Sequence, residues 1–486
     1  MTSPNSYITM DLATSSLAPG DNANSIPRPI TPPEKTGVVV FSGGSAANSL
    51  VDIFRSIVHQ KKCQLSYVIP ISDNGGSSSE LIRVFGGPGI GDIRSRLVRL
   101  IPEDDSTSEK ASIRHFFNYR LPDDPDAARL EWLNIVEARH ELWNAISSSR
   151  KELIRPFLNM LNLEIVKRAR PSSVFTFSRA SIGNMFLTGA RLFTGSLESS
   201  IELLTLICHV PESTKVLPAV NTNFTHHISA GLADGTIITG QNSISHPSAP
   251  TAVPDVLSAE SEVVDETEIH DAIEDANLPG TLPSLRKQNI SFSKEHEADL
   301  PARIERIWYI NPYGQEIRLK ANPKVLESLQ NANCVIYSIG SLYTSLIPNL
   351  ILRGVGEAIL SPSIRSKVLI LNSTTDRETG PSSKPFSATD FVAAIAQACW
   401  ESRGMKGLPP RTEYRQYVTH IFHLEGAGTP VVDKAEMIEL GIETNRLYGR
   451  AGSGGWMRYD DAALEQAIAA KVGPRVGRSR RNTLKQ

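Results

Sequence analysis

Residues 38–48 read VVVFSGGSAAN, an apolar run followed by paired glycines and the start of a helical pattern. The run predicts a buried β-strand, and residues 49–58 continue as a helix with Leu50, Ile53 and Ile57 on one face. Glycines permit a turn that side chains would block, and the first N–H groups of a helix lack intrahelical partners, so they can face a phosphate. Such a unit is typical of the nucleotide-binding half of a doubly wound sheet.

An ordinary tight strand-to-helix turn is the alternative explanation of this stretch. It lacks the third glycine of a dinucleotide-binding fingerprint and the Gly-Lys-Ser/Thr ending of a P-loop. Whether this stretch is a phosphate site or a simple turn depends on what the other loops of the sequence contain.

The composition is that of a soluble globular protein. Of 486 residues, 40% are apolar, which is enough for a substantial core. Lys plus Arg number 50 and Asp plus Glu number 52, so the overall charge favours neither nucleic acid nor an anionic membrane as partner. The four cysteines are far apart, which fits a reducing compartment, and no apolar run reaches the length of a membrane span or a signal-peptide core. We therefore expect a cytoplasmic protein.

Three segments differ in composition from the rest of the chain. Residues 1–36 are rich in Ser, Pro, Asn and Thr, and residues 247–300 carry twelve Asp and Glu against three Lys and Arg. Both are predicted to be disordered, because they cannot bury enough apolar surface to offset the entropy of ordering. Residues 473–486 form a basic tail, for which a solvated disordered end is favoured over targeting or RNA binding. One α/β domain is expected over residues 37–472.

Within that domain, short strands alternate with helices. The alternation predicts a Rossmann-like doubly wound, mostly parallel sheet. A polar helical insertion is expected over about residues 109–170, and residues 215–245 are predicted to form paired strands around a turn at 233–236. Further strands are predicted at residues 65–71, 303–310, 334–338, 367–372 and 417–422.

Four loops rich in Gly, Ser, Asp or Asn follow strand-like runs. In a parallel sheet such loops gather at one edge, where ligands bind. Their agreement favours a phosphate site over an isolated turn. They span residues 42–48, 72–79, 86–97 and 340–345.

Three of these loops carry side chains that could bind a ligand or take part in a reaction. Asp73 precedes paired glycines and three serines, so it could hold Mg²⁺ or accept a proton beside a phosphate; an Asx turn with a serine cap is the alternative. Asp92 opens a helix that continues with Arg94 and Arg96 as fixed cations, unless Asp92 only caps the helix and the arginines lie on the surface. Tyr343 could stack on a base or sugar, with plain packing as the alternative.

In this order, the loops resemble motifs of the family that joins the bacterial gluconeogenesis factor YvcK and the archaeal 2-phospho-L-lactate transferase CofD. FSGGS at 41–45 is similar to the opening glycine loop, SDNGGSS at 72–78 to the DDGGSS motif, and GIGDIR at 89–94 to PGDIR. SIGN at 181–184, GSLYTS at 340–345, Asn372 and ETG at 378–380 also fit. The resemblance covers most of residues 37–472 outside the insertions and lies nearer the YvcK branch.

The sequence departs from the family pattern at two of these loops. Residues 45–47 read SAA where the family usually has Gly-Thr-Gly, and Asn74 replaces a second aspartate. Loss of that carboxylate should lower affinity for a metal ion. Ligand binding tolerates such changes better than catalysis does.

The resemblance implies a nucleotide-sugar-binding protein of the UDP-sugar type with a metabolic or regulatory role. The alternative is a Mg²⁺-dependent phosphotransferase of the CofD type, in which Asp73 and Asp92 are catalytic and Asp73 is the metal ligand. A pure interaction protein would leave the four loops unexplained.

The expected partner is a nucleotide or nucleotide-sugar, with neither nucleic acid nor membrane, and a homodimer is left open. The expected ligand-binding residues are Gly43, Gly44, Ser45, Asn48, Asn74, Gly75, Gly76, Ser77, Ser78, Gly91, Arg94, Asn184, Gly340, Ser341, Tyr343, Thr344 and Asn372.

Overall fold

The computed structural model describes residues 37–72, 75–102, 108–169, 174–245, 282, 299–451 and 457–472. The predicted disordered segment 1–36, nearly all of the acidic segment 247–300 and the basic tail 473–486 lie outside the described residues. The same holds for Asp73 and Asn74.

The main sheet has seven strands in the order β11-β10-β9-β8-β1-β2-β3, and every neighbouring pair is parallel. The chain builds β1, β2 and β3 toward one edge, then returns to place β8 on the other side of β1 and continues to β11. This order confirms the predicted doubly wound Rossmann-like sheet and puts its switch point between β1 and β8. The strands are β1 (Gly37–Phe41), β2 (Leu65–Ile69), β3 (Thr214–Pro218), β8 (Ala332–Tyr337), β9 (Ser366–Ile370), β10 (His420–His423) and β11 (Glu443–Arg446).

The central strands are apolar because helices cover both faces of the sheet. All residues of β1, β2, β8 and β9 are buried, and Val40, Phe41 and Ile336 have no exposed surface. Near-continuous apolar runs of this kind are typical of parallel strands inside an α/β fold.

A second sheet, antiparallel, has the order β5-β4-β6-β7. It corrects the prediction for residues 215–245. The hairpin around 233–236 is present, but residues 215–218 belong to β3 of the main sheet and Gln241–Ser245 forms helix α9. The strands are β4 (His227–Leu232), β5 (Ile237–Thr239), β6 (Ile304–Ile310) and β7 (Glu316–Ile317), with a separate hairpin of β12 (Gly449–Ala451) and β13 (Met457–Tyr459).

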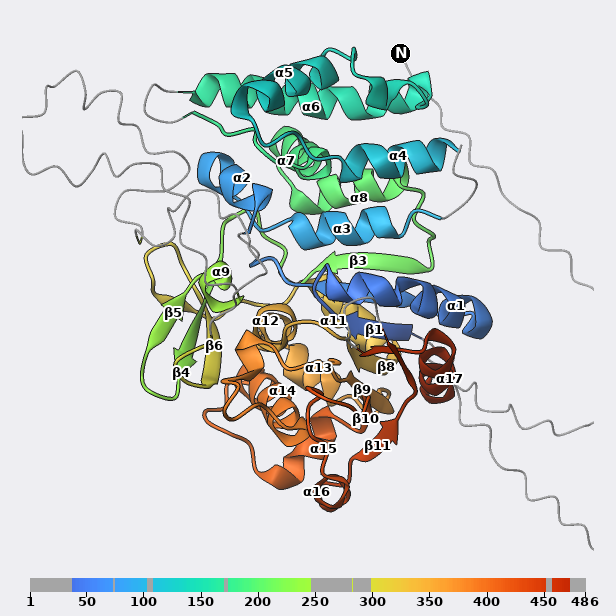
Figure 1. The fold of residues 1–486 in the computed structure, drawn as a ribbon, viewed down its shortest axis with the longest axis vertical. Coiled ribbons are helices and arrows are strands. Elements are labelled where there is room, and N and C mark those ends of the chain that lie inside the picture. The colour runs from blue at the N-terminus through green and yellow to red at the C-terminus, as the bar shows by residue number, and fades with distance from the viewer. Residues whose placement is uncertain are drawn as a thin grey trace, which may run out of the picture. The chain divides into compact units, whose positions relative to one another are not determined.

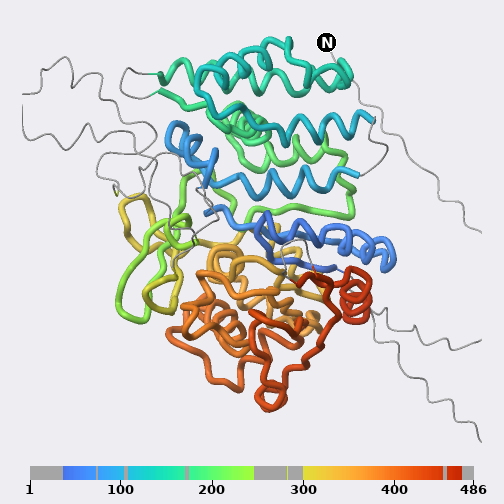
Figure 2. Tube along the Cα trace, in the orientation of Figure 1, coloured from blue at the N-terminus to red at the C-terminus, as the bar shows by residue number. Residues whose placement is uncertain are grey.

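Helices occupy the segment predicted as a helical insertion. In Figures 1 and 2, α5 and α6 form an outer layer over α7, and α8 and α3 lie between α7 and strand β3. The predicted insertion contains α4 (Glu109–Asn118), α5 (Pro125–Val136) and α6 (Ser148–Arg168). The neighbouring helices outside it are α3 (Gly91–Arg99), α7 (Ile182–Thr194) and α8 (Leu197–Ile207).

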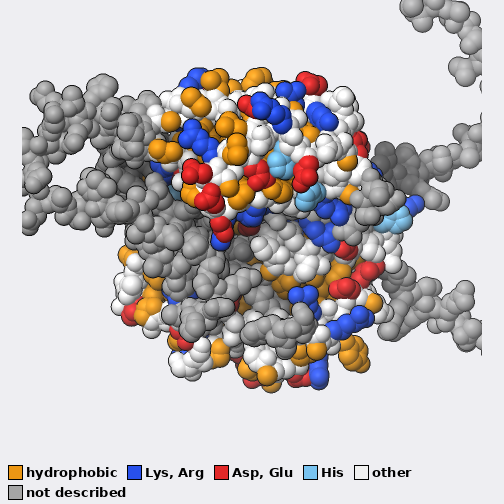
Figure 3. All heavy atoms as spheres, turned by 45° about the horizontal axis from the view of Figure 1, so that its top comes forward, with side chains coloured by type: hydrophobic (Ala, Val, Ile, Leu, Met, Phe, Trp, Pro, Cys, Tyr) orange, Lys and Arg blue, Asp and Glu red, His pale blue; other side chains and the backbone are white. Residues whose placement is uncertain are grey.

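The outer layer exposes several large apolar side chains, among them Leu130, Leu163 and Val166. Figure 3 turns this end of the molecule forward and shows hydrophobic and charged side chains interspersed on it.

The remaining helices pack on the sheet or connect its strands. None of the helices in the described part of the chain has the length and apolarity needed to cross a bilayer. They are η1 (Ala46–Leu50), α1 (Val51–Lys61), α2 (Ser77–Phe85), η2 (Glu141–Trp143), α11 (Pro323–Gln330), η4 (Leu342–Leu346), α12 (Ile347–Leu350), α13 (Val355–Ile359), η5 (Arg377–Thr379), α14 (Ala388–Ser402), η6 (Arg411–Glu413), α15 (Tyr414–Tyr417), α16 (Lys434–Glu439) and α17 (Asp461–Lys471).

Candidate anion-binding site at the switch point

The loops that follow β1, β2 and β8 line one cavity of about 540 Å³, together with the start of α3. The cavity lies at the carboxyl ends of the strands, next to the point where the strand order reverses, which is where open α/β sheets bind ligands. Predicted site residues that line it are Gly43, Gly44, Ser45, Gly75, Gly76, Ser77, Ser78, Gly91, Asp92, Arg94, Asn184, Gly340, Ser341 and Thr344.

The two glycines after β1 are required by close packing. A Cβ atom on Gly44 would lie 2.2 Å from Asp92 Oδ1, and one on Gly43 would lie 2.5 Å from Ser345 Oγ. The β1 loop therefore presses directly against α3 on one side and the β8 loop on the other. Any larger side chain would push these walls of the cavity apart.

Asp92 lies in the first turn of α3 and packs against the β1 loop at Gly44. Its carboxylate accepts a hydrogen bond from the Gly44 N–H. Burial raises the pKa of Asp92 above its usual value, while the Gly44 N–H and the charges of Arg96 and Arg94 oppose that shift. Asp92 therefore does more than cap a helix, because its carboxylate faces the cavity and holds the glycine loop.

Arg94 supplies a cation to the same cavity. Its Nε donates to Asn184 Oδ1 (3.2 Å) and one Nη donates to Asn118 Oδ1 (3.0 Å). The side chain is buried, and burial, together with the charge of Arg120, lowers the pKa of Arg94 to about 10. Neutral amide partners hold the guanidinium in place and leave its charge available to an anion.

Asn184 connects this arginine to the β2 loop. Its amide nitrogen donates to Ser77 Oγ (3.1 Å) and lies 3.4 Å from Ser78 Oγ, at the first turn of α2. Asn184 itself stands in the first turn of α7. The N-terminal turns of α2, α3 and α7 thus meet at one cavity, and each brings the partial positive charge of a helix start.

A second cavity of about 750 Å³ adjoins the first on the β9 side of the switch point. Asn372 lines it and grips the β8 loop: its Oδ1 accepts from Gly340 N (2.9 Å) and its Nδ2 donates to Gly340 O (2.9 Å). Gly340 has φ +138°, a conformation that favours glycine. Residues shared by the two cavities are Ser45, Ala46, Ile339, Gly340 and Ser341.

Two predicted ligand-binding residues do not line either cavity. Asn48 Nδ2 donates to Ser95 Oγ (2.8 Å) and so links η1 to α3. The hydroxyl of Tyr343 donates to Ile304 O (3.0 Å), and its ring packs edge-on against Phe386, so the side chain matches the packing alternative.

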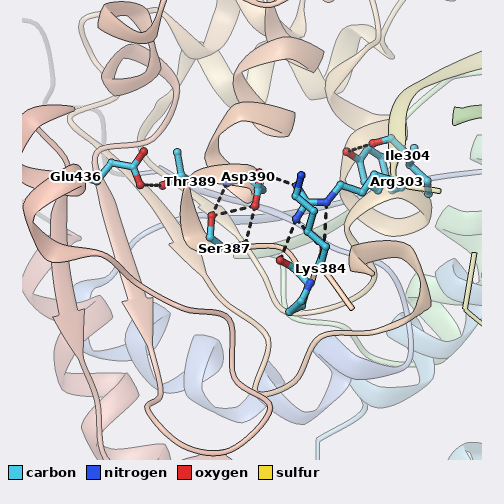
Figure 4. Close-up of polar contacts among 9 residues, drawn as sticks. Arg303, Ile304, Lys384, Ser387, Thr389, Asp390 and Glu436 are labelled. Atoms are coloured by element: carbon cyan, nitrogen blue, oxygen red, sulfur yellow. Dashed lines mark hydrogen bonds and ion pairs between the residues drawn. The ribbon is translucent and has the colours of Figure 1, made fainter. Parts of the chain in front are cut away.

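Ile304, whose carbonyl accepts from the Tyr343 hydroxyl, lies next to a cluster of polar contacts around Arg303, Lys384 and Asp390 (Figure 4). The Arg303 guanidinium reaches Lys384 O (2.8 Å) and Asp390 Oδ1 (3.2 Å), while its Cζ lies 4.6 Å from the centre of the Phe386 ring. Asp390 is also part of the capping box that opens α14. Tyr343 therefore anchors the β8 loop to this cluster.

Neither Arg120 nor Asn242 was predicted from the sequence, whereas Arg96 was predicted as a fixed cation and Glu378 as part of the ETG motif. Arg120 and Asn242 line the first cavity, Arg96 is buried beneath the β1 loop, and Glu378 is buried behind the β8 loop. Arg96 follows the GIGDIR motif by two residues, and Glu378 is the first residue of the ETG motif, so local motifs indicate both. Arg120 and Asn242 carry no comparable signal, because the fold alone brings them to the cavity.

The described residues do not form a magnesium site by themselves. Within this part of the chain, no three His, Cys, Asp or Glu side chains come together in a geometry suited to a metal. Asp92 is the carboxylate that lines the first cavity, and it is held by the Gly44 N–H between two arginines. The role of Asp73 as metal ligand stays a prediction, because Asp73 lies outside the described residues.

Comparison with known proteins places the chain in a family. A model of the family described as 2-phospho-L-lactate transferase CofD matches residues 38–443, which include the loops after β1, β2, β8 and β9. The protein belongs to the CofD family. This confirms the resemblance inferred from the loops.

Relatives of this CofD-family protein occur in yeast and in bacteria. It is 41% identical over 406 residues to an uncharacterized protein of Saccharomyces cerevisiae, covering 80% of this chain and 90% of the relative. It is 22% identical over 435 residues to a gluconeogenesis factor of Halalkalibacterium halodurans, covering 90% and 96%. A crystal structure of a UPF0052 family member from Bacillus halodurans shares the fold, with TM-score 0.54, 21% identity and coverage of 90% and 99%.

Proposed function

We propose that this CofD-family protein binds a nucleotide-sugar of the UDP-sugar type in the cytoplasm, with a metabolic or regulatory role. One observation carries the proposal: three helix N-termini, Arg94 and Arg120 converge on a cavity at the switch point of the sheet. Backbone N–H groups and fixed guanidinium groups are the donors that recognise a diphosphate. The relatives named as gluconeogenesis factors are consistent with a metabolic role.

The second cavity supports a ligand larger than phosphate. Asn372, Ser373, Thr374 and Asp376 line it with amide, hydroxyl and carboxylate groups, which suit the hydroxyls of a ribose and the polar edge of a base. The proposal therefore places the diphosphate in the first cavity and the nucleoside in the second, with Ser341 between them.

Isothermal titration of the full chain with UDP-N-acetylglucosamine, GDP and NAD tests the proposal. The Arg94→Met variant should weaken binding of the preferred ligand by about tenfold or more, because a buried charge-assisted contact is lost. Arg99→Met is the matched control, since Arg99 lies on the same helix but pairs with Asp52 outside the cavity. Absence of both heat and thermal shift with all three ligands would overturn the proposal.

A CofD-type transferase is the second candidate, and the position of Asp92 favours it. Its carboxylate lines the cavity with a raised pKa, which suits a group that accepts a proton from an attacking hydroxyl. Incubation with UDP-N-acetylglucosamine and MgCl₂, followed by chromatography for UMP and UDP, tests for turnover. Equal product formation by the wild type and Asp92→Asn would rule out this role for Asp92.

A further inference from the structure

Arg96 is a fully buried arginine directly beneath the β1 loop. It has no exposed surface, and its two Nη atoms donate hydrogen bonds to that loop. Nη1 donates to Ala47 O (3.1 Å), and Nη2 donates to Gly43 O (3.1 Å) and lies 3.3 Å from Ser42 Oγ. Its Cζ lies 4.4 Å from the centre of the Tyr67 ring.

No carboxylate in the described part of the chain forms an ion pair with Arg96. Asp92 stands one helical turn earlier on α3 and opposes the lowering of the Arg96 pKa that burial causes, but it gives its hydrogen bond to Gly44. A buried cation whose acceptors are backbone carbonyls is costly to maintain. Its charge is also poorly screened by solvent, so it acts on neighbouring groups over several ångströms.

Arg96 and Asp92 hold one peptide unit between them. The C=O of Gly43 and the N–H of Gly44 belong to the same planar trans peptide, so they point in opposite directions. Arg96 Nη2 donates to the Gly43 carbonyl, and the Gly44 N–H on the opposite side of the peptide donates to Asp92, which lines the cavity. The orientation of this peptide is therefore set from α3.

Two of the neighbouring loop residues offer no side-chain donor in place of Arg96. Ala46 and Ala47 have no polar side-chain atoms, and the β1 loop lacks a third glycine. The carbonyl of Ala47 faces the same guanidinium, so both ends of the loop depend on Arg96.

We propose that Arg96 is a positioning residue for the anionic part of the ligand: it orients the Gly43–Gly44 peptide and supplies a buried positive charge behind the phosphate-binding loop. This inference rests on the proposed nucleotide-binding function. It predicts that loss of Arg96 weakens ligands in proportion to their negative charge, which a merely structural role would not do.

The test compares UDP, UMP and inorganic diphosphate by titration of the wild type, Arg96→Met and Arg96→Lys. Arg96→Met should weaken UDP by about tenfold or more and UMP by a smaller factor, because UMP carries less charge. Arg96→Lys should keep the wild-type ratio of UDP to UMP affinity, since it keeps the charge, while both affinities fall with the lost carbonyl contacts. Arg99→Met on the exposed face of α3 should leave all three affinities unchanged.

Melting temperatures show whether each variant is folded. A folded Arg96→Met with wild-type UDP affinity, or with equal losses for UMP and UDP, would overturn the inference. If Arg96→Met does not fold, a changed UDP to UMP ratio in Arg96→Lys would overturn it instead.

The wild type separates this inference from the proposed function. If the wild type binds inorganic diphosphate but no nucleotide, the proposed function is contradicted. The inference on Arg96 is then tested by comparing the diphosphate affinities of the wild type and Arg96→Met. Binding of neither UDP nor diphosphate would overturn both.

Discussion

Glu378 shows how a single buried carboxylate can fix a binding loop. Its Oε2 accepts from Tyr343 N (2.8 Å) and Thr344 N (3.0 Å), and its Oε1 accepts from Thr344 Oγ1 (2.6 Å). These N–H groups open η4 and would otherwise be free for a ligand. The β8 loop therefore contributes its serines and backbone around Gly340 to the cavities, while the carboxyl group of Glu378 occupies its helix start.

The ionisation of Glu378 should be visible in the stability of the protein. Burial and the nearby charge of Asp376 raise the pKa of Glu378 to about 8, against the opposing hydrogen bonds from Thr344 and Tyr343. Because the folded-state pKa lies above the unfolded value, the folded chain binds the extra proton, and its contribution to stability is lost as pH rises from about 4.5 to about 8. Glu378→Gln should remove this contribution, up to about 1.4 kcal/mol per pH unit.

Urea denaturation of the wild type and Glu378→Gln across pH 5–8 measures the difference. Glu357→Gln is the control, because Glu357 is a largely exposed carboxylate with 73% side-chain exposure. Parallel stability curves for the wild type and Glu378→Gln would show that Glu378 does not titrate in this window.

At the scale of elements, the sequence predicts strands well where burial is complete. The runs at β1, β2, β8 and β9 are buried throughout and mostly apolar, because both faces of a central parallel strand are covered. Edge strand β11 reads ETNR and has no apolar run, so the sequence does not predict this strand. The predicted strand at 417–422 was shifted, since α15 takes Tyr417 and β10 begins at His420.

The choice of neighbouring strand is the second feature that the sequence predicts poorly, because strand pairing depends on the whole topology. Strand β3 lies close in sequence to β4 but pairs with β2, and no local pattern distinguishes these outcomes. The site shows the same division: the loop glycines, Asp92 and Arg94 were predicted from local motifs. Arg120 and the packing of Tyr343 depend on distant elements and could not be.

Close packing between α6 and α7 makes a prediction at this scale. A Cβ atom on Gly189 would lie 2.0 Å from Phe157 O, so Gly189→Ala must push the two helices apart. Gly→Ala in an open helix position stabilises a protein, but here overpacking should destabilise it by about 1–3 kcal/mol. Asn159→Ala, at an exposed position of α6, should not destabilise the protein, because Ala favours a helix more than Asn does. Chemical denaturation measures both, and an unchanged or stabilised Gly189→Ala would contradict the helix packing.

At the scale of the whole molecule, the switch point divides the chain into two halves of one sheet. Strands β1 to β3 and helices α2 and α3 supply the glycine loop, Asp92 and Arg94, whereas β8 and β9 supply Ser341 and Asn372. The β8 loop borders both cavities and is held from the β9 side by Asn372. A ligand that fills both cavities must therefore contact both halves at once.

Hydrogen exchange with and without ligand distinguishes this arrangement from a one-sided site. UDP-N-acetylglucosamine should slow amide exchange in residues 43–48, 75–78 and 91–95 of the first half and in 340–345 and 372–376 of the second. At a ligand concentration of a hundred times Kd, the same binding should raise the free energy of unfolding by about 2.7 kcal/mol. UDP should protect both halves as well, because its diphosphate and nucleoside fall in different cavities, whereas inorganic diphosphate should protect mainly the first half. Protection by UDP confined to one half would show that the second cavity does not hold the nucleoside.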